Sequence, residues 1–186
     1  VYTWKAGAKY EGGWKEDKKD GRGTMVWPDK SSYSGDWVAD AREGKGTFMY
    51  VNGDKYVGEF KNGEQSGQGI FSWANGAVYE GQWIDNVRNG KGHYKWANGD
   101  VYEGDWKDDM PHGQGSLTLA DGTRYKGGFR KGMEEGDGVM LTPDGVRFEG
   151  SFKQGKKHGP FIETDRNGQI IRKGVYKFGT LDVAEK

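Results

Sequence analysis

The chain has 186 residues, of which only 33% are hydrophobic and 34 are glycine, yet its 14% aromatic content argues against disorder. Lys+Arg and Asp+Glu each number 28, so the formal net charge is zero and provides no global field that would draw the chain to nucleic acid. The absence of cysteine excludes disulfides, thiolate metal sites and a catalytic thiol, and no run approaches the roughly 18 apolar residues of a membrane span.

The N-terminal segment carries no charged-then-apolar pattern typical of a signal peptide. The chain begins at Val1 rather than at Met, so we expect a fragment of a longer protein. The lack of cysteine fits a reducing compartment, and we therefore expect a cytoplasmic location.

An aromatic residue recurs every 23 residues, at Tyr10, Tyr33, Tyr56, Tyr79, Tyr102, Tyr125 and Phe148. Glycine follows two positions later and a second aromatic two positions after that, as in Tyr102, Gly104 and Trp106. A fixed period of this kind indicates a repeat architecture. We predict a single domain over 1–186, with a partial repeat over 1–9, seven repeats over 10–170, and a closing strand and tail over 171–186.

The second half of each repeat contains Gly-x-Gly, then an alternating apolar segment, and then Asn-Gly or Asp-Gly, as at Asn52-Gly53. Asn-Gly suits the positive φ angles of two-residue hairpin turns. We therefore predict two short strands per repeat, with tight turns at these pairs. The first repeat has Asp29-Lys30 instead, and we expect a looser turn there.

Alternation along the strands assigns Tyr102, Gly104 and Trp106 to one face, together with Gly113 and Gly115 of the following strand. The sheet is therefore expected to be apolar on one side and polar on the other. We expect the rings of neighbouring strands to lie on the glycines, because a Cβ there would lift a ring away. Each buried aromatic covers about 150 to 250 Å², which contributes about 4 to 6 kcal/mol before entropy is subtracted.

The combination of Tyr-Glu-Gly-x-Trp, Gly-x-Gly and Asn-Gly or Asp-Gly at a period of 23 resembles the MORN repeat, the "membrane occupation and recognition nexus". The resemblance spans residue 10 to about residue 170. It implies an all-β fold, an elongated single-layer antiparallel sheet built as a meander of tandem hairpins, in the form of a twisted rod or curved ribbon. The residues alone leave a closed barrel or propeller open. Choline-binding hairpins are a further alternative, but they pair adjacent aromatics, which this chain lacks.

The apolar face is richer in aromatics than packing on glycine requires. A single sheet has no second layer to cover such a face, so we predict a groove for an extended or helical peptide of a partner protein. The residues predicted to bind the partner are Phe48, Tyr50, Phe71, Trp73, Tyr94 and Trp96. The resemblance implies a scaffold in cytoskeletal or membrane–cytoskeleton assembly.

Basic residues gather near both ends, and MORN repeats as a family are associated with phosphoinositides. Binding to an anionic membrane is therefore the alternative function, through Lys15, Lys18, Lys19, Lys156 and Lys157. Each basic residue near an anionic bilayer contributes about 1 kcal/mol, but acidic neighbours dilute both clusters. A meander also ends in an open strand, so we predict a homodimer formed by pairing of Gly174–Phe178 with its symmetry mate.

The histidines, His93, His112 and His158, have no partner at the spacing of a metal site or of a nucleophile and its base. Gly-x-Gly recurs in nearly every repeat and lacks the order of a nucleotide-binding loop, so we interpret these glycines as structural. We therefore expect no enzyme activity, no metal and no cofactor.

Overall fold

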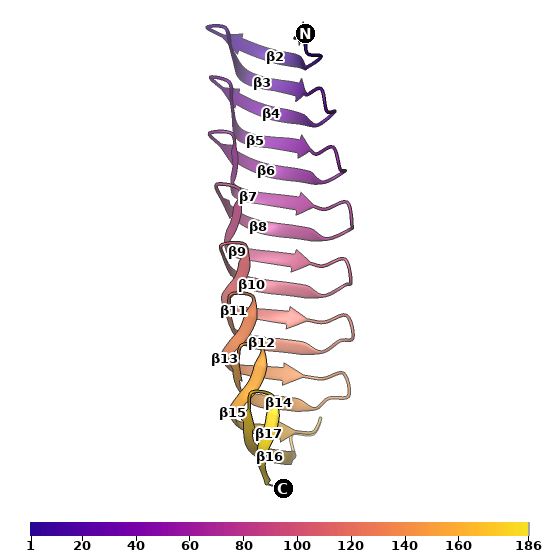
Figure 1. Ribbon diagram of the computed structural model, residues 1–186, viewed down its shortest axis with the longest axis vertical. Helices are drawn as coiled ribbons and strands as arrows, with labels where there is room; N and C mark the ends of the chain where they lie inside the picture. The colour runs from indigo at the N-terminus through magenta and orange to yellow at the C-terminus, as the bar shows by residue number, and fades with distance from the viewer. Residues whose placement is uncertain (186) are drawn as a thin grey trace. The chain divides into compact units, whose positions relative to one another are not determined.

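The computed structural model describes the backbone of residues 1–185 and the side chains of residues 1–182. The described residues form 17 strands of one antiparallel sheet, with consecutive strands paired, which confirms the predicted all-β meander (Figure 1). No described residue belongs to a helix, so none lies in a helix that could span a bilayer. The chain divides into two compact units, Val1–Gly90 and Lys91–Lys186, and each is described by itself.

The first unit contains β1 to β8 and the start of β9. The bounds are β1 (Tyr2–Thr3), β2 (Lys9–Lys15), β3 (Lys18–Val26), β4 (Ser32–Val38), β5 (Ala41–Met49), β6 (Lys55–Lys61), β7 (Glu64–Ser72), β8 (Val78–Ile84) and β9 (Val87–Lys95). The second unit continues with β10 (Val101–Lys107), β11 (Met110–Thr118), β12 (Arg124–Arg130), β13 (Met133–Leu141), β14 (Arg147–Lys153), β15 (Lys156–Thr164), β16 (Ile170–Lys177) and β17 (Thr180–Glu185).

Two kinds of turn alternate along the chain, and their positions differ from the prediction. Between β10 and β11, Asp108 and Asp109 both have positive φ, 50° and 64°, as in a two-residue type I′ hairpin turn. Asn62-Gly63, which was not among the predicted pairs, forms the two-residue turn between β6 and β7, whereas the predicted pairs, such as Asn52-Gly53, lie instead in longer loops between repeats. There the Gly53 N–H donates to the Tyr50 carbonyl at 3.1 Å, and Gly53 has positive φ while Asn52 does not. The predicted two-residue turns at these pairs are therefore wrong.

The first repeat forms the same loop although it lacks the glycine. The Lys30 N–H donates to the Trp27 carbonyl at 3.0 Å, and Lys30 adopts a φ of 76°. Asp29 Oδ1 accepts hydrogen bonds from the Ser31 N–H and hydroxyl, at 2.9 and 2.6 Å. The looser turn expected here is wrong, because these hydrogen bonds hold a lysine in the left-handed region.

The second strand of each repeat bends at the first glycine of Gly-x-Gly. Gly113 has a φ of 66°, and the pairing of β10 with β11 shifts register just after Gly104. A Cβ at Gly113 would meet Asp105, whereas a Cβ at Gly115 would meet Tyr102. The two glycines therefore do not share a face as predicted, because the bulge interrupts the alternation of side chains.

The core of each unit is a ladder of aromatic rings. Tyr102 is fully buried, and its ring meets the edges of Trp106 on its own strand at 5.4 Å and of Phe129 in the next repeat at 4.9 Å. Its hydroxyl donates to the Asp105 carbonyl at 2.8 Å. The same bond recurs in the other tyrosine repeats, so each ring is packed and each phenol is satisfied.

Glycine makes room for this ring on two strands. A Cβ at Gly115 would lie 2.6 Å from Cε2 of Tyr102, and a Cβ at Gly104 would lie 2.5 Å from the Gly115 Cα. The hydroxyl over Gly104 belongs to Tyr102 of the same strand. We predicted that a ring from a neighbouring strand lies on Gly104, and this is wrong. The ring of Tyr102 lies on Gly115 of the neighbouring strand, and Gly104 allows the backbones of β10 and β11 to approach closely.

The C-terminal residues form a further hairpin. On β16, Gly174 lies opposite Phe161 of β15 on one side and Ala184 of β17 on the other. The free edge predicted at Gly174–Phe178 is therefore wrong, since both sides of that strand are paired. The predicted homodimer required an unpaired edge on β16, and β15 and β17 already occupy both of its edges.

Replacing Gly104 by alanine is expected to destabilise the sheet by more than 2 kcal/mol, because its Cβ would meet backbone atoms that cannot rotate away. Gly136→Ala is the matched control. Gly136 has a φ of 77° with no atom within 4 Å of the added Cβ, so only about 1 kcal/mol of backbone strain is expected. Urea unfolding of both variants measures the difference, and equal losses would reject the steric account.

Lys30→Gly is expected to stabilise the protein by about 1 kcal/mol, because it relieves the left-handed strain of a residue with a Cβ. Thermal melting measures the change, and Lys30→Ala separates loss of the side chain from relief of the backbone. A variant with glycine at this position that melts no higher than the alanine variant would contradict this interpretation of the loop.

Candidate partner-binding face

In the first unit, the predicted partner-binding residues form one continuous row with Trp27. Ring centroids are 5.5 Å apart for Trp27 and Phe48, 4.5 Å for Phe48 and Tyr50, 5.6 Å for Tyr50 and Phe71, and 4.5 Å for Phe71 and Trp73. All five side chains are half-buried. The ends of β3, β5 and β7 and the loops that follow them thus bring these rings together and leave part of each one accessible.

The second unit holds the other predicted pair. Tyr94 and Trp96 have ring centroids 4.6 Å apart, and Tyr94 lies 5.9 Å from Trp106. Both predicted residues are half-buried. The equivalent positions in the following repeat are Leu117 and Leu119, so the aromatic row does not continue.

The bend in each second strand folds its beginning over its end. Arg42 and Phe48 are six residues apart on β5, a separation of about 20 Å in a straight strand. Nevertheless, the Arg42 guanidinium carbon lies 5.1 Å from the Phe48 ring centroid, and 5.9 and 5.3 Å from those of Tyr33 and Phe60. The apolar face of this unit is therefore concave, with a cation over its rings.

A hollow of about 820 Å³ lies beside this bend. Its lining includes Lys19, Trp27, Asp40, Arg42 and Phe48. Lys19 Nζ is paired with Asp40 Oδ1 at 2.8 Å, whereas the Arg42 guanidinium donates to the Gly63 carbonyl. Aromatic surface and charged groups therefore line the same hollow.

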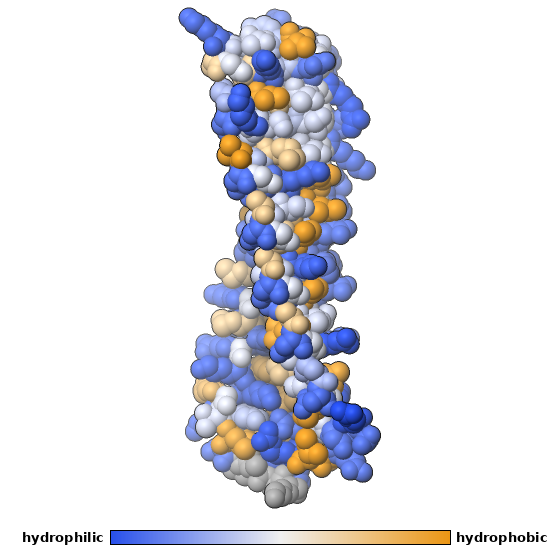
Figure 2. Space-filling model, turned by 90° about the vertical axis from the view of Figure 1, so that its right-hand side faces the viewer, coloured by the Kyte–Doolittle hydropathy of each residue, from blue (hydrophilic) through white to orange (hydrophobic). Residues whose placement is uncertain are grey.

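The other face of the first unit is more polar. It has a hollow of about 750 Å³ whose lining includes glycine backbone and the side chains of Val57 and Ile70, which are 40% and 38% exposed. Figure 2 presents the side that lies at the right of Figure 1, where hydrophobic residues are interspersed among hydrophilic ones. The aromatic row has no counterpart among the residues lining this second hollow.

Burial of the tyrosines sets the electrostatics of the aromatic face. Removal from water, followed by the nearby charge of Asp36, raises the pKa of Tyr33 to about 12. Burial also raises the pKa of Tyr50 and lowers that of Arg42. The phenols are therefore neutral and hydrogen-bonded in the folded protein.

A family model described as "MORN repeat" matches residues 10–32, 33–55, 56–78, 79–101, 102–124, 125–147 and 148–169. The chain belongs to the MORN repeat family. The seven predicted repeats are confirmed with the expected period. No curated protein matches the sequence.

The fold of this MORN-repeat chain is similar to that of two solved domains from Drosophila melanogaster. The SAS-4 (dCPAP) TCP domain, in complex with a proline-rich motif of Ana2 (dSTIL), has 13% identity and a TM-score of 0.51, covering 84% of this chain and 83% of that chain. The TCP10c domain of Sas-4 has 14% identity and a TM-score of 0.49, covering 85% and 93%. At these identities the likeness concerns the fold alone.

The lysines of the alternative lipid site differ in accessibility. Lys15, Lys18 and Lys156 are exposed. Lys19 is paired with an acid and lies 5.1 Å from the Trp37 ring centroid. Lys157 is paired with Glu163 at 3.2 Å and lies 4.0 Å from the Phe148 ring centroid. Two of the five positive charges are thus already engaged within the chain.

Sequence reasoning missed a buried acid in the last MORN repeat. Glu163 occupies the repeat position of Phe48, yet its side chain is only 7% exposed. It accepts hydrogen bonds from Lys157 Nζ at 3.2 Å and from Arg172 Nε at 2.8 Å. The signal was present in the sequence, as an acid at a repeat position that is otherwise apolar, with a lysine six residues before it.

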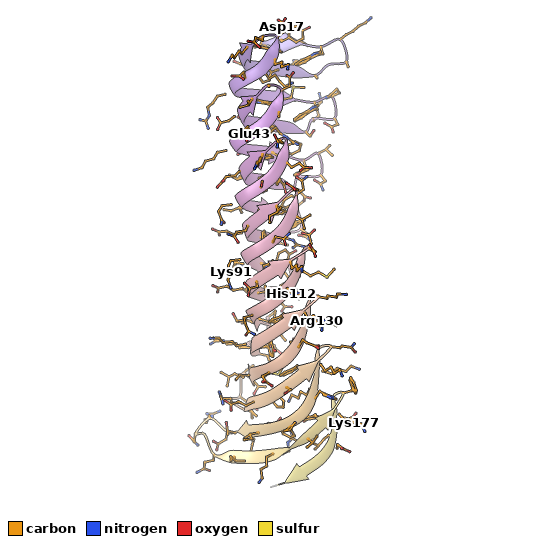
Figure 3. The ribbon with its side chains drawn as sticks, turned by 90° about the vertical axis from the view of Figure 1, so that its left-hand side faces the viewer. Asp17, Glu43, Lys91, His112, Arg130 and Lys177 are labelled. Carbon is orange, nitrogen blue, oxygen red and sulfur yellow. The ribbon has the colours of Figure 1, made fainter. Side chains whose placement is uncertain are left out.

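The described residues contain no cluster of three or more His, Cys, Asp or Glu side chains that could hold a metal ion. His112 lies on β11 (Figure 3). His158 Nδ1 accepts a hydrogen bond from the Phe178 N–H at 3.3 Å.

The free energy of unfolding is expected to fall as pH rises from 10 toward 12. The folded-state pKa of Tyr33 lies above its ordinary value of 10, so its stabilising contribution is complete below pH 10 and is lost as the phenol ionises in the folded state. Denaturant unfolding across this range, combined with tyrosinate absorbance, measures the effect. The pKa values of Tyr56, Tyr102 and Tyr125 are raised as well, so Tyr33→Phe should remove only one phenol's share of the slope, and an unchanged slope would contradict the prediction.

Proposed function

We propose that this MORN-repeat chain is a non-catalytic scaffold that binds an extended segment of a partner protein on its aromatic face. The observation that carries the proposal is the row of half-buried rings from Trp27 to Trp73. All described strands belong to one sheet, so the described residues provide no second layer to cover these rings. Accessible aromatic rings in a concave face are typical anchors for a partner.

The occupant that we propose is an extended, proline-rich peptide. Polyproline II segments dock on grooves lined by aromatic rings, and they lose little conformational entropy on binding. The SAS-4 TCP domain, whose fold is similar, is in complex with a proline-rich motif of Ana2. That complex supports the choice of occupant, and the rings of this chain provide the chemistry.

The setting that we propose is a cytoskeletal or membrane–cytoskeleton assembly in the cytoplasm, which rests on membership of the MORN family. Direct binding to anionic lipid has weaker support. Lys19 and Lys157 form ion pairs with carboxylates of the same chain, and their ammonium groups lie over aromatic rings. Their charges are therefore less available to a bilayer.

Replacing Tyr50, Trp73 and Trp96 together by serine is expected to weaken partner binding at least about 30-fold, since removal of one anchoring aromatic costs about 2 kcal/mol or more. Their backbone hydrogen bonds close the loops between repeats and do not require the rings. Affinity capture with the wild-type chain and the triple variant as baits, followed by titration of the captured partner, measures the loss.

The matched control replaces Val57, Ile70 and Ile84, which are exposed apolar residues of the first unit, by serine. The control variant should bind as the wild type does. Because Tyr50 accepts a hydrogen bond from Gln65 at 2.9 Å, circular dichroism and a cooperative melt must show that the triple variant remains folded. A folded triple variant that retains the partner would refute the proposed site.

A further inference from the structure

The guanidinium of Arg42 is a half-buried cation without an acidic partner among the described residues. Its hydrogen bond to the Gly63 carbonyl uses one of five N–H donors, and its guanidinium carbon lies close to the ring centroids of Tyr33 (5.9 Å), Phe48 (5.1 Å) and Phe60 (5.3 Å). The carboxylate of Glu43, the next residue in the chain, accepts a hydrogen bond from the Asn62 N–H at 2.9 Å. Burial of a cation without a counter-ion is unfavourable, and the remaining donors favour an anion.

The repeat itself shows how such a cation is satisfied elsewhere in the chain. Lys157 occupies the position of Arg42 in the last repeat, and Glu163 occupies the position of Phe48. There the carboxylate of Glu163 lies 3.2 Å from Lys157 Nζ. In the first repeat, Lys19 occupies the same position and is paired with Asp40 at 2.8 Å. At Arg42 the chain provides a ring and a hollow instead of an acid.

We propose that the hollow beside Arg42 receives an acidic side chain, Asp or Glu, of the extended peptide bound on the aromatic face. This inference rests on the proposed function and specifies the chemistry of the partner. A carboxylate matches the fork of the guanidinium. The neighbouring residue of the peptide lies on Trp27 and Phe48, whose ring centroids are 5.5 Å apart.

The other charges that line the hollow favour this placement. Asp40 is neutralised by Lys19, and Asp29 accepts both hydrogen bonds of Ser31 within its own loop. Of the two cations that line the hollow, Lys19 and Arg42, only Arg42 has no carboxylate partner among the described residues and can bind an incoming carboxylate. The negative charge of Asp29 disfavours a carboxylate beside that loop and so favours its placement at the guanidinium.

A random peptide library displayed on phage, with no free peptide C-terminus, identifies ligands of the wild-type chain and restricts the acid to side chains. The best ligand is then synthesised as two peptides with blocked ends. One keeps the acidic residue, and the other has Asn in place of Asp or Gln in place of Glu. Affinities for the wild-type chain and for Arg42→Gln form a double-mutant cycle. Each single change should weaken binding about tenfold, and the double change should be no weaker than either.

Lys45→Gln is the matched control, because Lys45 lies on the same strand and lines the hollow of the opposite face. It should bind both peptides as the wild type does. The peptide-side change requires no variant protein, so it tests the inference even where Arg42→Gln is less stable.

The outcomes separate the two proposals. Enriched peptides without an acid, or additive losses in the cycle, would overturn the carboxylate site while leaving the aromatic scaffold intact. Failure to enrich any peptide, or equal binding by the folded Tyr50, Trp73 and Trp96 serine variant, would overturn the scaffold and this inference with it. Enriched acidic ligands with the expected coupling support both.

Discussion

The contact on which each repeat depends is a buried tyrosine ring seated on glycine. Tyr102 illustrates it, with its ring on Gly115, its edges against Trp106 and Phe129, and its phenol bound to the Asp105 carbonyl. One side chain thereby joins two strands of its own repeat to the next repeat. Because the ring fills the place of a missing Cβ, large aromatics and abundant glycine act together to order a thin sheet.

The bend that accommodates this packing also shapes the candidate functional face. A positive φ at the first glycine of each Gly-x-Gly redirects the second strand, and residues six positions apart then meet. In the last repeat this brings Lys157 to Glu163, which closes the site with an internal ion pair. In the second repeat it brings Arg42 over Phe48, which leaves rings and an unpaired cation at the surface of a hollow. The same backbone geometry thus produces a closed site and an open one.

Residue patterns predicted much of this organisation. The period of 23, the strands and the grouping of Phe48, Tyr50, Phe71 and Trp73 could be predicted, because repeated positions reveal shared packing. The need for glycine at Gly104 was predicted too, but for the wrong reason, since backbone and not a neighbouring strand's ring would meet its Cβ. The turns were misassigned because the two-residue turns share no sequence signature: Asp108-Asp109 has no glycine, whereas Asn62-Gly63 occupies the equivalent position. The edge was misplaced, because the segment after Phe178 has no repeat signature and becomes a strand only by pairing with β16.

The sequence by itself determined the repeat, the alternation of aromatic and glycine, and the all-β meander, since these depend on side-chain size at regular spacing. Only the tertiary structure decided which rings remain half-exposed, that Arg42 lies over them, and that Glu163 is buried with two cations. These features depend on how far each strand bends. That bend arises from left-handed backbone conformations and shifts of register, which the alternation of residue types does not encode.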